Sequence, residues 1–315
     1  MARLHTLLNR NKLQLSGAGL ITFLLVLLAF ISNLFHDDED KVRSDQPQTA
    51  LMVTSPCMPQ KIDFCGEKVP LQYFDVSESM ERELIVNTYF HSQTLLNIKR
   101  SRRYFPIIEP ILKANGIPDD FKYLAMAESG FSYIVSPRGA AGFWQLLEGT
   151  ARDYGLTVNE EVDERYHLEK ATEAACMYLK DSYQDYGNWT MVAASYNVGR
   201  KGVERQIERQ GETDYYNLLL NEETARYVFR ILALKAVLET PEKYYFFVPE
   251  LERYPEIPYR EEILDGSVAD FGEFAKARNT NYKMLKFLNP WLRDNQLQNK
   301  EQKEYVIRIP TTREP

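Results

Sequence analysis

The chain has 315 residues, of which 44% are hydrophobic and 26% charged, a balance typical of a globular protein with about two folded units. Its net charge of −7 disfavours a nucleic-acid-binding protein, because contacts with phosphate backbones need a basic surface. The one strongly basic stretch, residues 97–104, is expected to be the solvated C-terminal end of a helix. Three cysteines and four histidines at no ligand spacing disfavour a metal site and a Ser-His-Asp triad, and we expect no cofactor.

The N-terminal part predicts a membrane segment. Uncharged apolar residues run from 17 to 35, close to the roughly 20 residues of a membrane span. Cations precede this run and acids follow it, which places residues 1–16 in the cytoplasm and the rest of the chain outside. A cleaved signal peptide is the alternative, but the run lacks a clean small-residue cleavage site, so we favour a retained anchor. Residues 36–74 are expected to be a linker.

Two cysteines near the end of this linker, Cys57 and Cys65, are candidates for a disulfide. They lie eight residues apart in a stretch that contains Pro and Gly. In an oxidising compartment they would close a small loop, and in the cytoplasm they would stay free.

From residue 77 to about 240 the pattern is that of helix after helix. Ser77 is suited to cap the first helix, and Pro106 and Pro110 are expected to break up the next stretch. A helix over 117–129 follows, with Pro118 at its first position. Four further helices, each closed by Gly or Pro, are predicted at 169–187, 188–199, 201–211 and 222–241. We therefore expect a mainly α domain over 75–245.

After Pro241 the pattern changes. A Pro-punctuated, extended segment leads into two short helices around residues 279–282, and residues 304–310 alternate like a terminal strand. This strand–helix–helix–strand outline predicts a linker and a small α+β domain over 246–315.

One acidic residue interrupts the apolar face of the helix at 117–129. Phe121, Leu124, Ala125 and Glu128 fall at i, i+3, i+4 and i+7, so Glu128 is expected to point inward near the helix C-terminus. Burial and the negative end of the helix dipole both disfavour a carboxylate, which predicts a raised pKa suited to a general acid. The alternative is a glutamate at the rim of the core that reaches water or an arginine such as Arg138.

The segment after Glu128 is rich in glycine. Gly139 and Gly142 let the chain pass close to a ligand or to another backbone. Trp144 either stacks on a sugar or fills the core, and Gln145 is able to bind hydroxyl or amide groups. An acid with a raised pKa beside such a wall predicts a glycan site.

Four motifs in order, AMAESGF, SPRGAAGFWQL, ASYNVG and EETARYVFRILA, resemble those of the lytic transglycosylases of the soluble-transglycosylase (SLT) family, above all the membrane-bound lytic murein transglycosylase D type. The resemblance covers roughly 75–240 and includes DERY at 163–166. It implies a lysozyme-like helical fold that acts on peptidoglycan. Such enzymes cleave the β-1,4 bond between N-acetylmuramic acid and N-acetylglucosamine without adding water.

The resemblance also implies roles for individual residues. Glu128 matches the single catalytic acid/base, and the residues that match substrate-site positions are Ser136, Gln145, Leu147, Tyr196, Asn197 and Glu223. Two mild departures are FWQL in the second motif, and Ser195 and Val198 in the third. The tail resembles a LysM glycan-binding module more loosely, through residues 265–267, Asn289 and VIRIP.

A single acid suffices if the substrate supplies the nucleophile, since ring closure by the sugar's own 6-hydroxyl is intramolecular. We therefore expect 1,6-anhydro products. A lysozyme-type hydrolase is the alternative and would need a second carboxylate, for which Asp153 and Asp163 are unplaced candidates. A non-catalytic peptidoglycan-binding protein is the other alternative. The expected partners are peptidoglycan and a membrane, with the catalytic domain in the periplasm of the cell envelope; the oligomeric state is left open.

Overall fold

The computed structural model describes residues 53–312. Residues Ser55–Pro315 form one compact unit. The predicted anchor at 17–35 and most of the predicted linker lie outside the described residues. Within 53–312, no helix is both long enough and apolar enough to cross a bilayer.

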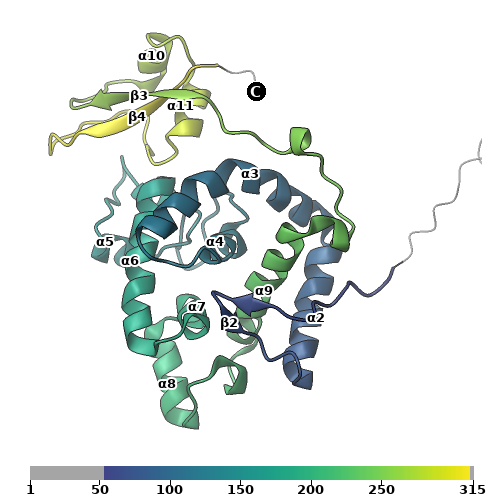
Figure 1. Ribbon diagram of the computed structural model, residues 1–315. Coiled ribbons are helices and arrows are strands. Elements are labelled where there is room, and N and C mark those ends of the chain that lie inside the picture. The colour runs from purple at the N-terminus through teal and green to yellow at the C-terminus, as the bar shows by residue number, and fades with distance from the viewer. Residues whose placement is uncertain (1–52, 313–315) are drawn as a thin grey trace, which may run out of the picture. The chain divides into compact units, whose positions relative to one another are not determined.

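The larger part of the unit is helical (Figure 1). Its helices are α2 (Phe74–Tyr89), α3 (His91–Ala114), α4 (Phe121–Ser129), α5 (Glu148–Asp153), α6 (Leu168–Tyr186), α7 (Trp189–Val198), α8 (Arg200–Gln210) and α9 (Glu222–Glu239). Two short strands, β1 (Asp63–Phe64) and β2 (Glu67–Lys68), form a hairpin before α2. Helix α9 is central, because α2, α4 and α7 all pack against it. Its residues 227–237 are buried except for Arg230, as expected of a central helix.

The smaller part follows at the C-terminus. Strands β3 (Tyr259–Leu264) and β4 (Tyr305–Pro310) pair antiparallel, and α10 (Phe271–Lys276) and α11 (Tyr282–Leu288) lie between them in the chain. Buried residues of β4 alternate with more exposed ones, so one face of this sheet packs into a core and the other stays open. The predicted strand–helix–helix–strand outline is confirmed, and with it the fold class: a mainly α domain followed by a small α+β domain.

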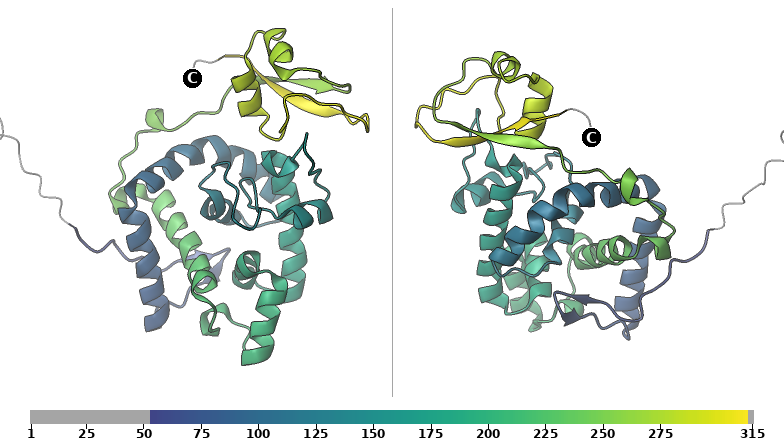
Figure 2. Two further views of the ribbon diagram at one scale, coloured as in Figure 1. Left: turned by 180° about the vertical axis from the view of Figure 1, so that it is seen from behind. Right: turned by 45° about the horizontal axis from the view of Figure 1, so that its top comes forward.

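Helix α3 differs from the prediction. It runs unbroken through Pro106 and Pro110, and both views in Figure 2 show it as one continuous, curved helix. The two prolines are exposed and lie four residues apart, on the same side of the helix. The backbone carbonyls that lose their partners therefore face water, while Ile108 and Leu112 bury the opposite side.

The basic stretch at 97–104 also differs from the prediction. It lies in the middle of α3, where its side chains hold other segments instead of being solvated at a helix end. Arg100 donates to the carbonyl of Gly130 at 2.7 Å, and Arg103 donates to the carbonyl of Pro255 at 2.8 Å. Ser77 likewise does not cap α2, since that helix already begins at Phe74.

The candidate disulfide is not formed, because Cys57 and Cys65 both carry free thiols. Cys57 lies in an exposed segment beside Tyr244, whereas Cys65 lies in the turn between β1 and β2. The backbone N–H of Cys65 donates to Asp120 at 2.6 Å, and burial raises the pKa of its thiol far above the usual range. The chain path between the two cysteines thus leads them to different neighbours.

Candidate active site

Glu128 lies in the last turn of α4, with its side chain partly buried, as the helical periodicity predicts. Phe121, Leu124 and Ala125 on the same face are fully buried. Gly130 then ends the helix in the left-handed conformation, with a φ of 55°. The hydrogen-bond partner of the Glu128 carboxylate is the hydroxyl of Tyr227, which donates to Oε1; Arg138, the partner of the alternative interpretation, lies exposed.

The pKa of Glu128 is raised to about 7, mainly by burial and to a smaller extent by the negative charge of Glu223. The hydrogen bond from Tyr227 and the charge of Arg230 act in the opposite direction. Burial dominates because Tyr227 is a neutral donor, which stabilises a carboxylate less than a direct ion pair does. Near neutral pH, Glu128 is therefore populated both as an acid and as a base.

The loop after α4 is tied to the end of that helix. The hydroxyl of Ser129 donates to the carbonyl of Phe143 at 3.0 Å. Trp144 is fully buried and its indole N–H donates to Thr172 at 2.9 Å, so it fills the core and does not present a ring for stacking. Its carbonyl accepts a hydrogen bond from the hydroxyl of Tyr196 at 2.7 Å. The loop is thus fixed to both α4 and α7.

Gln145 projects from this loop in an unusual backbone conformation, with a φ of 47°. Its amide nitrogen donates to the carbonyls of Ile134 at 3.1 Å and Gly142 at 2.8 Å. These two hydrogen bonds fix the orientation of the Gln145 side chain.

The DERY segment braces the same loop. The Arg165 guanidinium is paired with Asp163, with Nη2 to Oδ2 at 2.7 Å, and its Nη1 donates to the carbonyl of Gly139 at 2.8 Å. Gly142 passes so close that a Cβ there would lie 1.9 Å from the carbonyl oxygen of Arg165, and its φ is 78°. Only glycine fits this position. Asp163 is therefore engaged by Arg165 and is not free to act as a second carboxylate, whereas Asp153 lies exposed at the end of α5.

Helices α7 and α9 bring two more predicted residues together. The hydroxyl of Thr224 donates to Oδ1 of Asn197 at 2.8 Å, and the Asn197 amide approaches Glu223 at 3.5 Å. Asn221 caps α9 by accepting from the N–H of Thr224 at 3.0 Å. Glu223 thus lies exposed in the first turn of α9, where the helix dipole favours a negative charge.

Tyr196 and Glu223 lie near Glu128, and Asn197 approaches Glu223, where α4 and α7 pack against α9. Gln145 is connected to this group through the residue before it, Trp144, whose carbonyl accepts from Tyr196. The charge of Glu128 contributes to the raised pKa of Tyr196, which places the two side chains near each other.

Ser136 and Leu147 belong to the same loop, but their described contacts are local. The Ser136 hydroxyl accepts from the N–H of Ala140 at 3.0 Å within a turn, and Leu147 is 45% exposed just before α5.

Sequence reasoning missed Tyr227 and Arg230. Both belong to the motif EETARYVFRILA, of which only Glu223 was selected. The available signal was spacing, since Tyr227 follows Glu223 by four residues and so lies on the same side of α9. Among residues 53–312, no group of His, Cys, Asp and Glu side chains is arranged to hold a metal ion.

Comparisons with known proteins agree with this organisation. Residues 105–219 match the transglycosylase SLT domain, and residues 260–313 match the soluble lytic transglycosylase C-terminal LysM-like domain. Membrane-bound lytic murein transglycosylase D from two strains of Escherichia coli (K12 and O6:H1) is 30% identical over 175 residues. That match covers 54% of this chain and 38% of each relative, so the chain spans well under half of their length.

Two solved structures are also similar. An inactive mutant of lytic transglycosylase Slt from Pseudomonas aeruginosa is 20% identical, with a TM-score of 0.37, over 48% of this chain and 26% of that one. The 70 kDa soluble lytic transglycosylase from Escherichia coli is 17% identical, with a TM-score of 0.39, over 59% of this chain and 37% of that one. On the sequence matches, this chain carries a transglycosylase SLT domain followed by a soluble lytic transglycosylase C-terminal LysM-like domain.

Proposed function

We propose that the protein is a peptidoglycan lytic transglycosylase, which cleaves the β-1,4 bond between N-acetylmuramic acid and N-acetylglucosamine and leaves a 1,6-anhydro end. The observation that carries this proposal is the state of Glu128: one partly buried carboxyl group with a pKa of about 7, held by a neutral phenol. The matched SLT domain and the similarity to membrane-bound lytic murein transglycosylase D support the choice of reaction.

The chemistry needs one group that serves first as an acid and then as a base. Protonated Glu128 gives its proton to the glycosidic oxygen as that bond breaks, and positive charge develops on the muramic acid ring. The carboxylate that results then takes the proton from the 6-hydroxyl of the same sugar, whose oxygen closes the anhydro ring. A pKa near 7 suits both steps, because neither protonation state is strongly disfavoured at neutral pH.

The surrounding side chains would bind and orient the glycan. Tyr196 and Asn197 supply polar groups near Glu128, and Gln145 would supply another from the loop after α4. Ser136 and Leu147 would line the approach on the loop, and Glu223 would keep Asn197 in place through the contact at 3.5 Å. Tyr227 would hold the Glu128 carboxylate in one orientation throughout.

A lysozyme-type hydrolase remains a second candidate for one reason. Glu223 is an exposed carboxylate whose charge raises the pKa of Glu128, so in a hydrolase it would be the candidate to activate a water. The location follows from the function: we place the protein in the cell envelope, anchored through residues 17–35, with the catalytic domain in the periplasm.

Mass spectrometry of the fragments released from purified sacculi tests the proposal. The full chain in detergent is expected to release muropeptides one water lighter than hydrolytic products. Ordinary reducing ends would instead establish a hydrolase and give Glu223 the role of second carboxylate. Sacculi that are bound but not cleaved would leave only a binding role.

A further inference from the structure

The DERY segment, which braces the loop after α4, is also the segment on which the C-terminal part docks. The backbone N–H of Asp163 donates to the carbonyl of Trp291 at 2.9 Å, and that of Arg293 donates to the carbonyl of Glu161 at 2.8 Å. The two segments pair antiparallel at this point, like short strands. The C-terminal part therefore meets the DERY segment in a defined register.

The loop after α4 is shared between two hydrophobic cores. Phe143 and Trp144 belong to the core of the helical part. Ala141, which is 1% exposed, belongs instead to the core of the C-terminal part, together with Val162 and Tyr166. One side of the loop is thus packed into the C-terminal part, although the loop belongs to the helical part by sequence. A change in the docking of the C-terminal part should therefore reach the loop.

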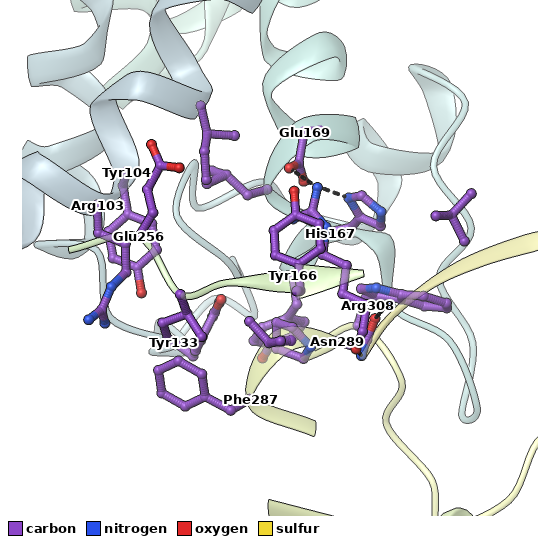
Figure 3. A pocket seen from close by; sticks show the side chains of 18 residues that line it. Arg103, Tyr104, Tyr133, Tyr166, His167, Glu169, Glu256, Phe287, Asn289 and Arg308 are labelled. Carbon is purple, nitrogen blue, oxygen red and sulfur yellow. Dashed lines mark hydrogen bonds and ion pairs between the residues drawn. The ribbon is translucent and has the colours of Figure 1, made fainter. Parts of the chain in front are cut away.

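Side chains from both parts complete this junction, which Figure 3 shows. Arg308 of β4 forms an ion pair with Glu169 of α6, and Nδ1 of His167 lies 3.3 Å from the same carboxylate. The central carbon of the Arg293 guanidinium lies 4.2 Å from the centre of the Tyr166 ring. The pocket that remains between the two parts, beside β4, has a volume of about 100 Å³, which is room for only a few water molecules. The two parts are thus held in one arrangement.

Arg165 connects this junction to the loop. Its Nε and Nη2 donate to the two carboxylate oxygens of Asp163, at 2.9 and 2.7 Å, and both residues are buried. Because the guanidinium is planar, this two-point contact directs the remaining nitrogen, Nη1, to the carbonyls of Gly139 at 2.8 Å and Leu146 at 3.3 Å. One rigid group therefore holds the loop at both ends of the stretch that carries Gln145.

We propose that the C-terminal part positions the loop after α4, and that Arg165 is the positioning residue through which it acts. The C-terminal part seats Asp163 by its backbone, Asp163 orients Arg165, and Arg165 fixes the loop that carries Gln145. The C-terminal part is then a component of the active site. That the positioned loop serves glycan cleavage rests on the proposed function, whereas the coupling of the C-terminal part to the loop does not.

Hydrogen–deuterium exchange of the full chain in detergent tests this coupling independently of catalysis. The amides of Ala141 and Leu146 donate to each other's carbonyls, both at 3.1 Å, so their exchange reports opening of the loop. Arg308→Glu places a second acid opposite Glu169 across the junction and should speed the exchange of these amides by about tenfold. Combining it with Glu169→Arg restores an opposite pair and should slow the exchange again.

The matched control is Arg278→Glu. Arg278 is, like Arg308, a partly buried arginine of the C-terminal part in an ion pair, but its partner Glu262 belongs to β3 of the same part. This variant should leave exchange of the loop amides unchanged. Faster exchange in Arg308→Glu that the swapped pair reverses and the control lacks supports the coupling. Unchanged exchange in Arg308→Glu, or equally fast exchange in the control, overturns it.

The rate at which sacculi are cleaved tests Arg165 itself. Arg165→Lys keeps the positive charge but offers a single nitrogen, which cannot hold Asp163 and both carbonyls of the loop at once. The rate should fall by about tenfold or more. If Arg165 acts by positioning Gln145, the same substitution should change the rate little in a Gln145→Ala background. A loss by the same factor in both backgrounds would show a merely structural role and overturn the assignment of Arg165.

This inference and the proposed reaction fail separately. Fragments with ordinary reducing ends would refute the reaction and leave the rate comparison in place, because it counts broken glycosidic bonds of either kind. A chain that does not cleave sacculi would also refute the reaction, and exchange of the loop amides would still decide the coupling. Anhydro products from a chain whose loop exchange is unchanged in Arg308→Glu would refute only this inference.

Discussion

Two glutamates reach the central helix α9 from different helices, and neighbouring residues of α9 receive them. Glu83 of α2 is 1% exposed, and Arg226 donates to it at 2.6 Å. Glu128 of α4 receives a hydrogen bond from Tyr227, which directly follows Arg226 in α9. One position on α9 thus offers a cation and the next a neutral phenol.

This difference separates a carboxylate with a structural role, Glu83, from one suited to acid–base chemistry, Glu128. A buried carboxylate that accepts a hydrogen bond from arginine contributes to the packing of α2 on α9. A carboxyl group that has only a neutral donor stays near the balance between its two protonation states, which is the property that acid–base catalysis requires. Substitutions at these two places should therefore have opposite consequences for stability and activity.

Glu128→Gln should give the largest effect on activity. The amide keeps the size of the side chain but carries no transferable proton, so release of anhydro-muropeptides should fall by about 10³-fold. The variant should still unfold cooperatively on heating and should still bind to sacculi. A variant with near-normal turnover would remove Glu128 from the mechanism.

Arg226→Ala should give the largest effect on stability. It leaves Glu83 buried without its cation, and we expect the free energy of unfolding to fall by about 3 kcal/mol. Denaturant titration measures this change. The matched control is Arg82→Ala, which breaks an exposed pair with Glu222, 2.8 Å apart, and should lower the free energy of unfolding much less. Equal losses in the two variants would contradict the comparison.

The pH dependence of stability should also distinguish Glu128. Its pKa is raised from 4.5 to about 7 in the folded state, so the folded chain binds more protons than the unfolded chain between these values. The contribution of this group to stability is therefore present at low pH and is lost as pH rises through 7. Glu128→Gln has no ionisable group here and lacks this loss. Its free energy of unfolding, measured relative to that of the unchanged chain, should therefore increase by on the order of 2 kcal/mol from pH 4 to pH 8. A constant difference in unfolding free energy across that range would show that Glu128 is solvated.

Periodicity predicted much of the helical part, because the apolar face of a helix is formed by residues three and four apart in the sequence. Helices α6, α7, α8 and α9 lie within two residues of their predicted bounds. The inward direction of Glu128 followed from the same rule. Proline misled the prediction for α3, since whether a proline breaks a helix depends on which side of the helix faces water.

The partners of the site residues were beyond sequence reasoning. Tyr227 lies 99 residues after Glu128, and only the packing of α4 on α9 joins them. The brace from Arg165 to Gly139 and the pocket beside β4 likewise depend on contacts between segments far apart in the chain. The residues of the site could be listed from motifs, but what sets their chemistry is the packing around them.

Removing the hydroxyl of Tyr227 should give the smallest effect, a shift in the pH dependence of the rate. Tyr227→Phe removes the hydrogen bond that lowers the pKa of Glu128, so that pKa should rise above 7. Because cleavage needs the protonated acid, the alkaline limb of the pH–rate profile should move up by about one pH unit, while the maximal rate changes less. The matched control is Tyr215→Phe, which removes a buried hydroxyl that donates to the carbonyl of Thr224 at 3.0 Å and does not contact Glu128. It should lower stability and leave the limb in place. A limb that stays fixed in Tyr227→Phe, or moves equally in both variants, would mean that the phenol positions Glu128 without tuning its proton affinity.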